Sequence, residues 1–474
     1  MSFSHISSSF RAGFSFDRPN LRSTIVWLLL ASDITGLFLC FHLAFIVRLG
    51  KFLDWRAPIL YLLIVVYLFG LYLADTYKLN KKVSRLLLSE RVLFSILVTV
   101  AAITSGIYLT GLWGSSPFVG RGILSIAVGL FSIWAITWRA LVSKWVKISQ
   151  EHSRFLVFGS NKKALAFGQE YHTFHADTEL VFLTEKRTNL PLAFRDSNCM
   201  VLDTVENFVD WKHQYWSGIL IEDGTNIPEA MVRKIMEMRL KGICVYSLAD
   251  FSEQFWQKIP PAYVQDDWFA FTSGFSILHN RVNVKLKQLI DFLAVLLLLI
   301  LTLPLTLIVA IAIKLDSPGS VFYSQVRTGL NGKKFKVHKF RSMYQNAEQK
   351  GVQWAKKKDT RITRVGYFLR LTRIDELPQL WNILKGEMSL IGPRPERPEF
   401  DLKLRKKIPY YDVRYLVKPG ITGWAQVCYP YGASVEDSYQ KVAYDLYYIK
   451  NYSLFLDVII ALKTIKVVIF GKGR

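Results

Sequence analysis

Two adjacent carboxylates, Asp375 and Glu376, precede a helical pattern with Pro378 in its first turn, in a region otherwise rich in Lys and Arg. Nearby positive charge lowers the pKa of a carboxylate, so we expect both side chains to be ionised. An ionised Asp can attack phosphorus, and a neighbouring carboxylate can bind Mg²⁺ together with phosphate oxygens. The spacing by itself favours a plainer alternative, acidic residues at the start of an ordinary helix.

Basic residues on both sides of this pair predict a phosphate-binding site. Arg and Lys neutralise phosphoryl oxygens, and Arg can do so through two parallel hydrogen bonds. The candidates lie at alternate positions of a possible strand, in a series of arginines at helical spacing, and in a rigid Gly-Pro-Arg-Pro loop; they are Lys339, Arg341, Arg370 and Arg394.

Four motifs occur in a specific order in the last ~190 residues. They are Lys-Phe-Arg-Ser-Met at 339–343, Asp-Glu-Leu-Pro-Gln at 375–379, Gly-Glu-Met-Ser-Leu-Ile-Gly-Pro-Arg-Pro at 386–395 and Lys-Pro-Gly-Ile-Thr-Gly at 418–423. In these motifs the chain resembles the bacterial polyprenyl-phosphate sugar-1-phosphate transferases, the large monotopic phosphoglycosyl transferases that initiate exopolysaccharide or O-antigen repeat units. Nearly the whole chain fits the layout of the long family members, with weaker motifs in the first 280 residues.

The resemblance implies a role for each matching residue of the site. Asp375 would be the nucleophile and Glu376 a ligand of Mg²⁺. Phosphate or nucleotide would be bound by Lys339, Arg370 and Arg394.

Three further residues match family positions outside the dyad. Asp445 matches a family acid that we assign to the substrate site, Asp291 an acid near the start of a re-entrant membrane helix, and Pro304 the breaker of that helix. The chain departs from the family where Arg373-Ile374 replaces the usual Ser-Leu and where Leu303 replaces a frequent Ser.

The implied reaction transfers a hexose 1-phosphate from a UDP-sugar to undecaprenyl phosphate and releases UMP, through a phosphosugar-aspartyl intermediate. The resemblance favours glucose or galactose as the sugar and a homodimer as the assembly. Membrane lipids are the other expected partners, and the expected location is the bacterial inner membrane with the catalytic domain in the cytoplasm.

The elements that must hold this site begin with four apolar stretches, each close to the ~20 residues of a spanning helix. They predict a four-helix transmembrane bundle over 24–140, and they are 24–47, 57–74, 92–113 and 122–138. Flanking Lys and Arg, Arg139 among them, place both ends of the bundle and the segment 1–23 in the cytoplasm. Asp33 and His42 in the first helix indicate either a proton or ligand site or, as we prefer in the absence of a second buried charge, an interhelical hydrogen bond.

Short apolar runs alternate with helical patterns over 141–280, which predicts a Rossmann-like α/β domain. Its first strand ends at Gly159-Ser160-Asn161, without the further glycines of a dinucleotide fingerprint. A nucleotide site is therefore less favoured than a regulatory or assembly module.

A fifth apolar run, 292–313, carries no charge and has basic residues on both flanks. Both ends should therefore lie in the cytoplasm. Pro304 bends the helix near mid-membrane, so we predict a re-entrant helix over 286–314 that returns to the same face. A kinked spanning helix is the alternative. The remaining domain, 281–474, is predicted to be mostly α-helical, and its apolar end, 454–470, could lie at the interface or in the core.

The composition agrees with this layout. The 474 residues have a formal charge of +23, yet 51% are hydrophobic, which excludes a disordered basic protein and disfavours a nucleic-acid binder. The four cysteines are scattered, so we expect no disulfide framework. Two other functions remain open, an NAD-dependent membrane enzyme that modifies sugar nucleotides and a non-catalytic scaffold for polysaccharide export.

Overall fold

The computed structural model describes residues 19–77, 85–111, 117–150, 154–159, 162–174, 179–184, 200–204, 216–223, 227–345, 347, 359–430, 432 and 434–469. The predicted N-terminal segment 1–23 lies, as far as residue 18, outside these residues. The chain divides into two compact units. One comprises 1–157, 168–219 and 234–244, and the other comprises 158–167, 220–233 and 245–474.

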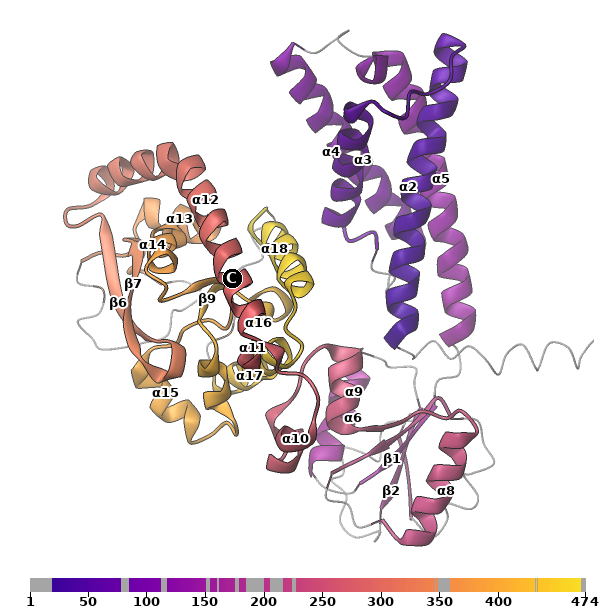
Figure 1. Ribbon diagram of the computed structural model, residues 1–474, viewed down its shortest axis with the longest axis vertical. Coiled ribbons are helices and arrows are strands. Elements are labelled where there is room, and N and C mark those ends of the chain that lie inside the picture. The colour runs from indigo at the N-terminus through magenta and orange to yellow at the C-terminus, as the bar shows by residue number, and fades with distance from the viewer. Residues whose placement is uncertain are drawn as a thin grey trace, which may run out of the picture. The chain divides into compact units, whose positions relative to one another are not determined.

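The N-terminal apolar stretches form long helices that pack on one another (Figure 1). Their bounds are α2 Pro19–Leu49, α3 Pro58–Leu73, α4 Arg85–Thr110, the 3₁₀ turn η1 Pro117–Val119 and α5 Arg121–Gln150. Leu37, Phe41, Tyr67 and Phe131 lie in their shared core, while many other apolar side chains face outward. By length and composition α2, α4 and α5 could each cross a membrane, whereas α3, with 16 residues, is shorter than the usual span.

A buried ion pair joins the first and last helices of this bundle. Arg139 donates to both carboxylate oxygens of Asp33, at 2.9 and 2.7 Å, and Tyr77 donates to the same carboxylate at 2.8 Å. Both charged side chains are at most 1% exposed. The interhelical hydrogen bond that we preferred for Asp33 is therefore confirmed. Our premise that no second buried charge is present was wrong, because Arg139 is buried beside Asp33 and is not a flanking surface charge.

Replacing Arg139 by Met should destabilise the bundle, because it leaves the Asp33 carboxylate buried without its cation. Breaking a buried pair in this way costs about 3–5 kcal/mol. Thermal unfolding of the purified protein measures the loss. Lys144→Met on the exposed side of the same helix is the matched control, and an equal effect of both variants would contradict the prediction.

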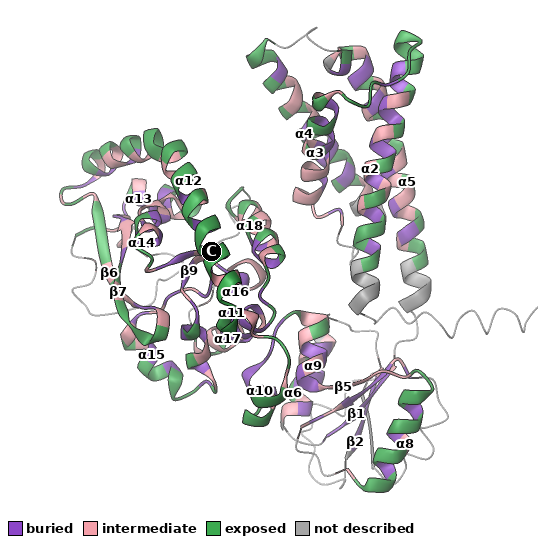
Figure 2. Ribbon diagram, viewed as in Figure 1, coloured by how far each residue is buried: buried purple, intermediate pink, exposed green. Residues whose placement is uncertain are grey.

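The region after the bundle contains the predicted alternation of strands and helices. The elements are β1 Arg154–Phe158, α6 Lys162–Phe174, β2 Glu179–Thr184, β3 Met200–Thr204, β4 Gly218–Ile221, α8 Glu229–Leu240 and β5 Val245–Ser247. The strands form one sheet in the order β3-β2-β1-β4-β5, and β2 and β3 are parallel with Leu180 opposite Met200. Figure 2 shows buried strands and an exposed outer face of α8.

Gly159 follows β1 in a left-handed conformation, with φ of 151°. A Cβ atom at this position would collide with the Glu222 carboxylate, which is buried just after β4. Glu222 thus fills the space above Gly159 where a nucleotide phosphate would have to approach. This arrangement agrees with the absence of a dinucleotide fingerprint; Ser160 and Asn161 lie outside the described residues.

Residues 248–280 form short elements that pack against the C-terminal region within the second unit. They are α9 Leu248–Phe251, the π-turn η4 Ser252–Trp256, the 3₁₀ turn η5 Pro261–Tyr263, α10 Asp266–Phe271 and α11 Ser276–His279. Lys450 donates to Glu253, and Trp424 donates to the carbonyl of Gln257 at 2.8 Å. The segment is therefore anchored on the domain that carries the candidate site.

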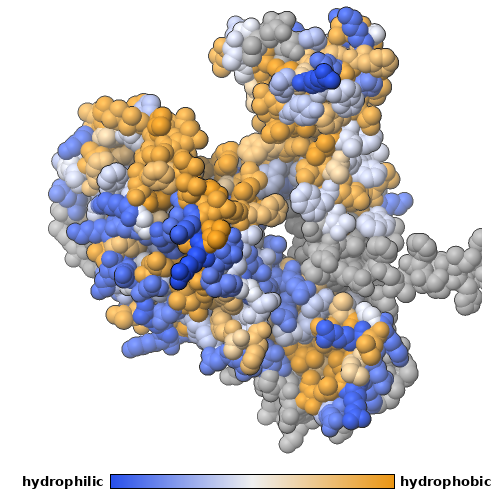
Figure 3. Space-filling view, viewed as in Figure 1, coloured by the Kyte–Doolittle hydropathy of each residue, from blue (hydrophilic) through white to orange (hydrophobic). Residues whose placement is uncertain are grey.

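The fifth apolar run forms α12, Arg281–Asp316, a 36-residue helix that contains Pro304. Figure 1 shows that this helix bends along its length, and Figure 3 shows apolar side chains gathered over it. Both arms of α12 pack on the same C-terminal domain. Val295 in the first arm contacts the cluster of Leu380 and Met388, while Val309 and Ile313 in the second arm join a cluster with Phe340 and Leu369.

The rest of the second unit supplies the frame of the site. It consists of β6 Phe322–Thr328, η6 Leu330–Gly332, β7 Lys334–Phe340, α13 Arg364–Thr372, η7 Ile374–Gln379, α14 Leu380–Leu384, β8 Ser389–Ile391, α15 Pro398–Arg405, η8 Tyr411–Leu416, β9 Gly420–Thr422, α16 Trp424–Cys428, α17 Val435–Lys450 and α18 Leu454–Ile469. Strands β6 and β7 form an antiparallel hairpin, and β8 pairs with β9 in parallel. Helix α18 buries Leu456 and Ile460 in the core and exposes Phe455 and Val458; its position at the membrane interface stays a prediction.

Candidate active site

The carboxylate pair lies on η7, a 3₁₀ turn that connects α13 to α14. Arg373 ends α13 with a left-handed φ of 59°, which redirects the chain and begins η7. Asp375 and Glu376 are only 8% and 7% exposed. They are therefore far more deeply buried than acidic residues that merely cap a surface helix, which is the plainer alternative.

Strand β7 brings Lys339 to this pair, and the amide of Asn382 fixes the strand in place. The Asn382 side chain accepts from the His338 amide at 3.1 Å and donates to the Lys336 carbonyl at 2.7 Å. Lys339 Nζ then donates to Glu376 Oε1 at 3.0 Å. Residues from two separate motifs are thus held together by backbone hydrogen bonds to one side chain.

Three cationic side chains lie close to the Glu376 carboxylate. Arg394 donates to its Oε1 at 2.7 Å and Lys339 to the same oxygen at 3.0 Å, while Arg373 lies 3.7 Å from Oε2. Burial alone would raise the pKa of Glu376, but Arg394 and Lys339 outweigh it and hold the pKa well below its usual range. Glu376 is therefore ionised at neutral pH.

Asp375 has the opposite shift. Burial raises its pKa above the ordinary value; Lys339 opposes this effect, and the neighbouring Glu376 charge adds to it. The surrounding positive charge therefore does not lower the pKa of Asp375 overall, and its ionised state stays a prediction. The physical reason is that the direct ion pairs go to Glu376, while Asp375 loses hydration without an ion pair of that strength.

Arg394 is held by a loop whose backbone is fixed on two sides. The Gly420 amide donates to the Pro393 carbonyl at 2.9 Å, and the Gly392 amide donates to the Thr422 carbonyl at 2.9 Å. A Cβ atom at Gly392 or Gly420 would collide with backbone of the other loop. The glycines of these two motifs therefore allow β8 and β9 to approach closely enough to aim Arg394 at Glu376.

Arg414, which our sequence analysis did not identify, also anchors the loop that carries Arg394. Its guanidinium donates to the Arg394 carbonyl and to Asp445 Oδ2, both at 2.9 Å, and to the Tyr411 hydroxyl at 3.0 Å. Arg414 and Asp445 are 6% and 1% exposed. Asp445 thus acts on the site through Arg414. Burial raises the pKa of Asp445 to about 6, with Arg414 opposing the rise.

The structure does not bring Arg341 to the dyad, contrary to the prediction. Strand β7 ends at Phe340, so the alternation that would place Arg341 beside Lys339 stops one residue too early. Its guanidinium donates to the carbonyls of Pro318 and Ser317, at 2.8 and 2.7 Å, just beyond the C-terminal end of α12. Arg341 therefore holds the second arm of the bent helix on the domain.

The other predicted residues have defined places. Arg370 lies in the last turn of α13, where its charge opposes the rise in the pKa of Asp375. Asp291 accepts from the Ser389 hydroxyl at 2.6 Å, which ties the first arm of α12 to β8. Pro304 lies within α12, and the hydroxyls of Thr302 and Thr306 donate to the carbonyls of Leu298 and Leu303, not to that of Ile300, whose amide partner the proline removes.

The donor set at η7 fits a magnesium ion bound mainly through substrate. Within the described residues no group of three or more His, Cys, Asp or Glu side chains could hold a metal alone. Mg²⁺, however, often takes only one or two carboxylates together with phosphate oxygens and waters. Glu376 is ionised, and its Oε2 has a cation only at 3.7 Å, so it can serve as such a ligand.

The structure thus combines helices that are long and apolar enough to cross a membrane with a buried carboxylate pair surrounded by cations. The family described as Bacterial sugar transferase matches residues 282–471, which include every residue of the dyad and its cations. The chain belongs to this family.

Three curated relatives illustrate the similarity. A UDP-N-acetylgalactosamine-undecaprenyl-phosphate N-acetylgalactosaminephosphotransferase of Aeromonas hydrophila is 43% identical over 51% of this chain and 56% of its own length. A UDP-glucose:undecaprenyl-phosphate glucose-1-phosphate transferase of Caulobacter vibrioides is 45% identical over 39% of this chain and 70% of its own. An uncharacterised sugar transferase of Bacillus subtilis is 38% identical over 40% and 89%. The match thus spans about half the length of the Aeromonas relative.

Proposed function

We propose that this protein transfers a sugar 1-phosphate from a UDP-sugar to undecaprenyl phosphate and releases UMP, which would initiate a polysaccharide repeat unit. The observation that carries the proposal is Asp375 beside Glu376, buried and ringed by Lys339, Arg370 and Arg394. The names of the relatives support the same donor and acceptor classes, with glucose in one and N-acetylgalactosamine in another.

The chemistry proceeds in two displacements at one phosphorus atom. A carboxylate oxygen of Asp375 attacks the sugar-bearing phosphorus, the bond from that phosphorus to the bridging oxygen breaks, and UMP leaves with that oxygen. A phosphate oxygen of undecaprenyl phosphate then attacks the same phosphorus. The bond to Asp375 breaks, the carboxylate is regenerated, and lipid diphosphosugar is released.

The cations of the site contribute positioning and charge. Phosphoryl transfer depends mainly on alignment and on stabilising the charge of the phosphoryl oxygens. Arg394 and Lys339 lie within hydrogen-bond distance of Glu376, which is next to the nucleophile Asp375. When substrate binds, its phosphate oxygens can replace the Glu376 carboxylate as acceptors of these hydrogen bonds. Magnesium held by Glu376 would offset phosphoryl charge when bound.

Helix α12 supports a re-entrant and not a spanning insertion. A straight helix of 36 residues would measure about 54 Å, well beyond a bilayer core of about 30 Å. Both of its arms are fastened to one domain, by Lys287 with Asp457 at 2.7 Å on one side and by Asp316 with the Val365 amide at 3.1 Å on the other. We propose that this domain faces the cytoplasm, on the side with more Lys and Arg.

The proposal also covers the rest of the layout. The strand order β3-β2-β1-β4-β5 supports a Rossmann-like domain, and the Glu222 carboxylate at Gly159 disfavours the NAD-dependent alternative. The homodimer stays a prediction, and so does the preference for glucose or galactose.

An assay of UMP release tests the function directly. The purified full chain is incubated with undecaprenyl phosphate, Mg²⁺ and one UDP-sugar at a time, including glucose, galactose and their N-acetylated forms. UMP and a lipid diphosphosugar should appear in equal amounts with at least one donor. Lack of UMP with every donor, in preparations that remain folded, would overturn the proposal.

The pH dependence of UMP release should reflect the opposite pKa shifts of Asp375 and Glu376. Asp375 must be ionised to attack, and its raised pKa moves the acidic limb of the rate above pH 3.8, where Asp ordinarily titrates. In Glu376→Gln the like charge is gone and Lys339 and Arg394 are freed, so the residual activity should have its acidic limb at lower pH. A limb that moves to higher pH in this variant would contradict the assignment.

Chelation should stop the reaction if Glu376 and the substrate phosphates share a magnesium ion. We expect EDTA to abolish UMP release and added Mg²⁺ to restore it. Glu376→Gln should require more Mg²⁺ for half-maximal rate, whereas Glu399→Gln, an exposed carboxylate on α15, should not. Full activity of Glu376→Gln at unchanged Mg²⁺ would remove Glu376 as a ligand.

A further inference from the structure

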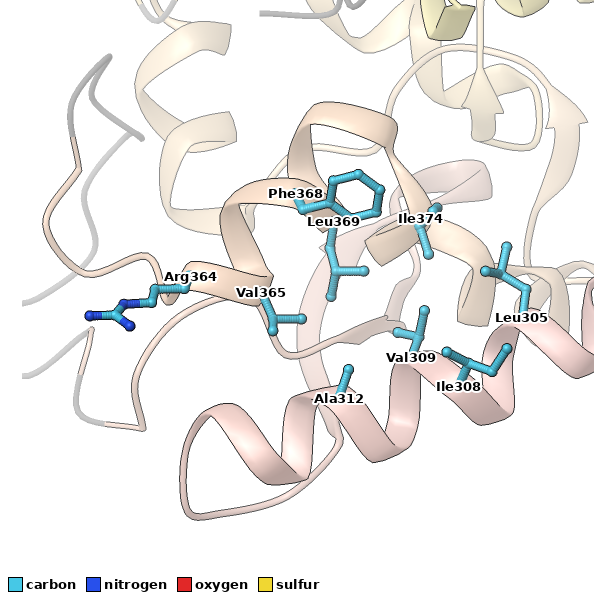
Figure 4. A pocket seen from close by; sticks show the side chains of 9 residues that line it. All are labelled: Leu305, Ile308, Val309, Ala312, Arg364, Val365, Phe368, Leu369 and Ile374. Carbon is cyan, nitrogen blue, oxygen red and sulfur yellow. The ribbon is translucent and has the colours of Figure 1, made fainter.

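An apolar pocket of about 440 Å³ lies between the second arm of α12 and helix α13 (Figure 4). Leu305, Ile308 and Ala312 line it from α12, and Val365 and Phe368 line it from α13. Figure 4 shows these side chains pointing toward one another across the space, whereas Arg364 at the rim points away. Among the described residues that line the pocket, the side chains other than that of Arg364 are all apolar.

Two residues at or near this pocket are direct chain neighbours of residues of the candidate site. Ile374 forms one wall, and the next residue is Asp375. Phe340 packs in one cluster with Val309 and Leu369, which line the pocket, and its preceding neighbour is Lys339. Consecutive Cα atoms are about 3.8 Å apart, so the backbone of Asp375 lies one residue from the wall of the pocket.

The open side of the pocket is apolar as well. Leu305, Ile308 and Phe368 are among the exposed large hydrophobic residues. Figure 3 shows that apolar surface also covers α12. Apolar surface of this kind is stabilised by contact with hydrocarbon and not with water. A ligand that matches both features has an alkyl or isoprenoid chain at one end and an anionic phosphate at the other.

We propose that this pocket binds the first isoprene units of the polyprenyl phosphate acceptor, with its phosphate directed toward Asp375 and the surrounding cations. The inference rests on the proposed function and adds the location of the acceptor chain. A polyprenyl phosphate satisfies the charge complementarity between a phosphate and the cluster of Lys339, Arg370 and Arg394. In an acyl phospholipid, a glycerol ester separates the phosphate from the alkyl chains. Such a lipid therefore fits an apolar pocket next to a cluster of cations less well.

A photoreactive polyprenyl phosphate, with a diazirine in its first isoprene units, tests the location in the full chain in detergent. We expect labelling of peptides that contain 305–312 and 365–374, with competition by undecaprenyl phosphate and not by phosphatidylglycerol. Ala312→Phe fills the pocket and should reduce labelling and raise the acceptor KM by about tenfold, equivalent to about 1.4 kcal/mol.

The matched control is Ala310→Phe, which introduces the same side chain two residues away on the same helix, where it does not line the pocket. This variant should label as the unaltered protein does. Equal behaviour of the two variants, labelling elsewhere, or equal competition by phosphatidylglycerol would overturn the proposal. Labelling at this pocket without UMP release from any donor would instead contradict the proposed function alone, so the two failures are distinguishable.

Discussion

Replacing Asp375 by Asn should abolish both UMP release and the phosphosugar-enzyme intermediate, with a loss of rate of at least about 10⁴-fold. The amide keeps the shape of the side chain but lacks the charged oxygen that attacks phosphorus. The measurement combines UMP release with the transfer of ³²P from the sugar-bearing phosphorus to protein. Normal product formation by this variant would remove Asp375 as the nucleophile.

The same variant should not lose stability. The raised pKa of Asp375 shows that burial makes its charged form costly in the folded protein, so a neutral Asn should be neutral or stabilising in thermal unfolding near pH 7. Asp412→Asn, at an exposed carboxylate of the same domain, controls for general effects of the substitution and should leave activity unchanged. A large loss of stability in Asp375→Asn would indicate a structural role.

Replacing Arg414 by Met should lower both stability and activity. The variant leaves Asp445 buried without its cation, which costs about 3–5 kcal/mol of unfolding free energy. Without Arg414, which opposes the rise, the pKa of Asp445 in the folded variant should lie above about 6. A raised carboxyl pKa costs stability as the pH rises through it, so the loss relative to the unaltered protein should grow as the pH rises above about 6. Urea unfolding at several pH values measures it.

The double variant Arg414→Met with Asp445→Leu separates positioning from stability. Removing both charges should recover most of the unfolding free energy, since an apolar pair can replace a buried ion pair. The rate should stay low, because the Arg394 carbonyl still lacks its anchor, and the effect should fall on kcat more than on the KM for the UDP-sugar. Recovery of full activity in the double variant would show that Arg414 acts on stability alone.

Local sequence was sufficient to select the residues that meet at the candidate site. Motif order identified Asp375, Glu376, Lys339 and Arg394, and the structure brings these four together. The apolar runs likewise predicted the helices of the bundle and α12, because the length of a hydrophobic segment is a property of the sequence itself. A motif and an apolar run are each made of residues that follow one another in the chain, so they can be recognised without knowledge of the fold.

Partners that are distant in sequence could not be predicted in the same way. The pairing of Asp33 with Arg139, more than 100 residues apart, was missed because nothing near either residue indicates the other. Arg414 was missed because it follows no motif that we used, although it stands four residues before Lys-Pro-Gly-Ile-Thr-Gly. Its proximity to the Arg394 carbonyl arises from the fold.

The sequence by itself determined which residues can carry charge and which segments are apolar and long enough for a membrane, and its motifs placed the chain in one family. The tertiary structure alone decided how two adjacent carboxylates differ, since Glu376 obtains the cations and Asp375 loses hydration. It also decided that Lys339 faces the dyad while Arg341 holds α12. The physical reason is that pKa values and ion pairs depend on distances across the fold and on the water that burial removes.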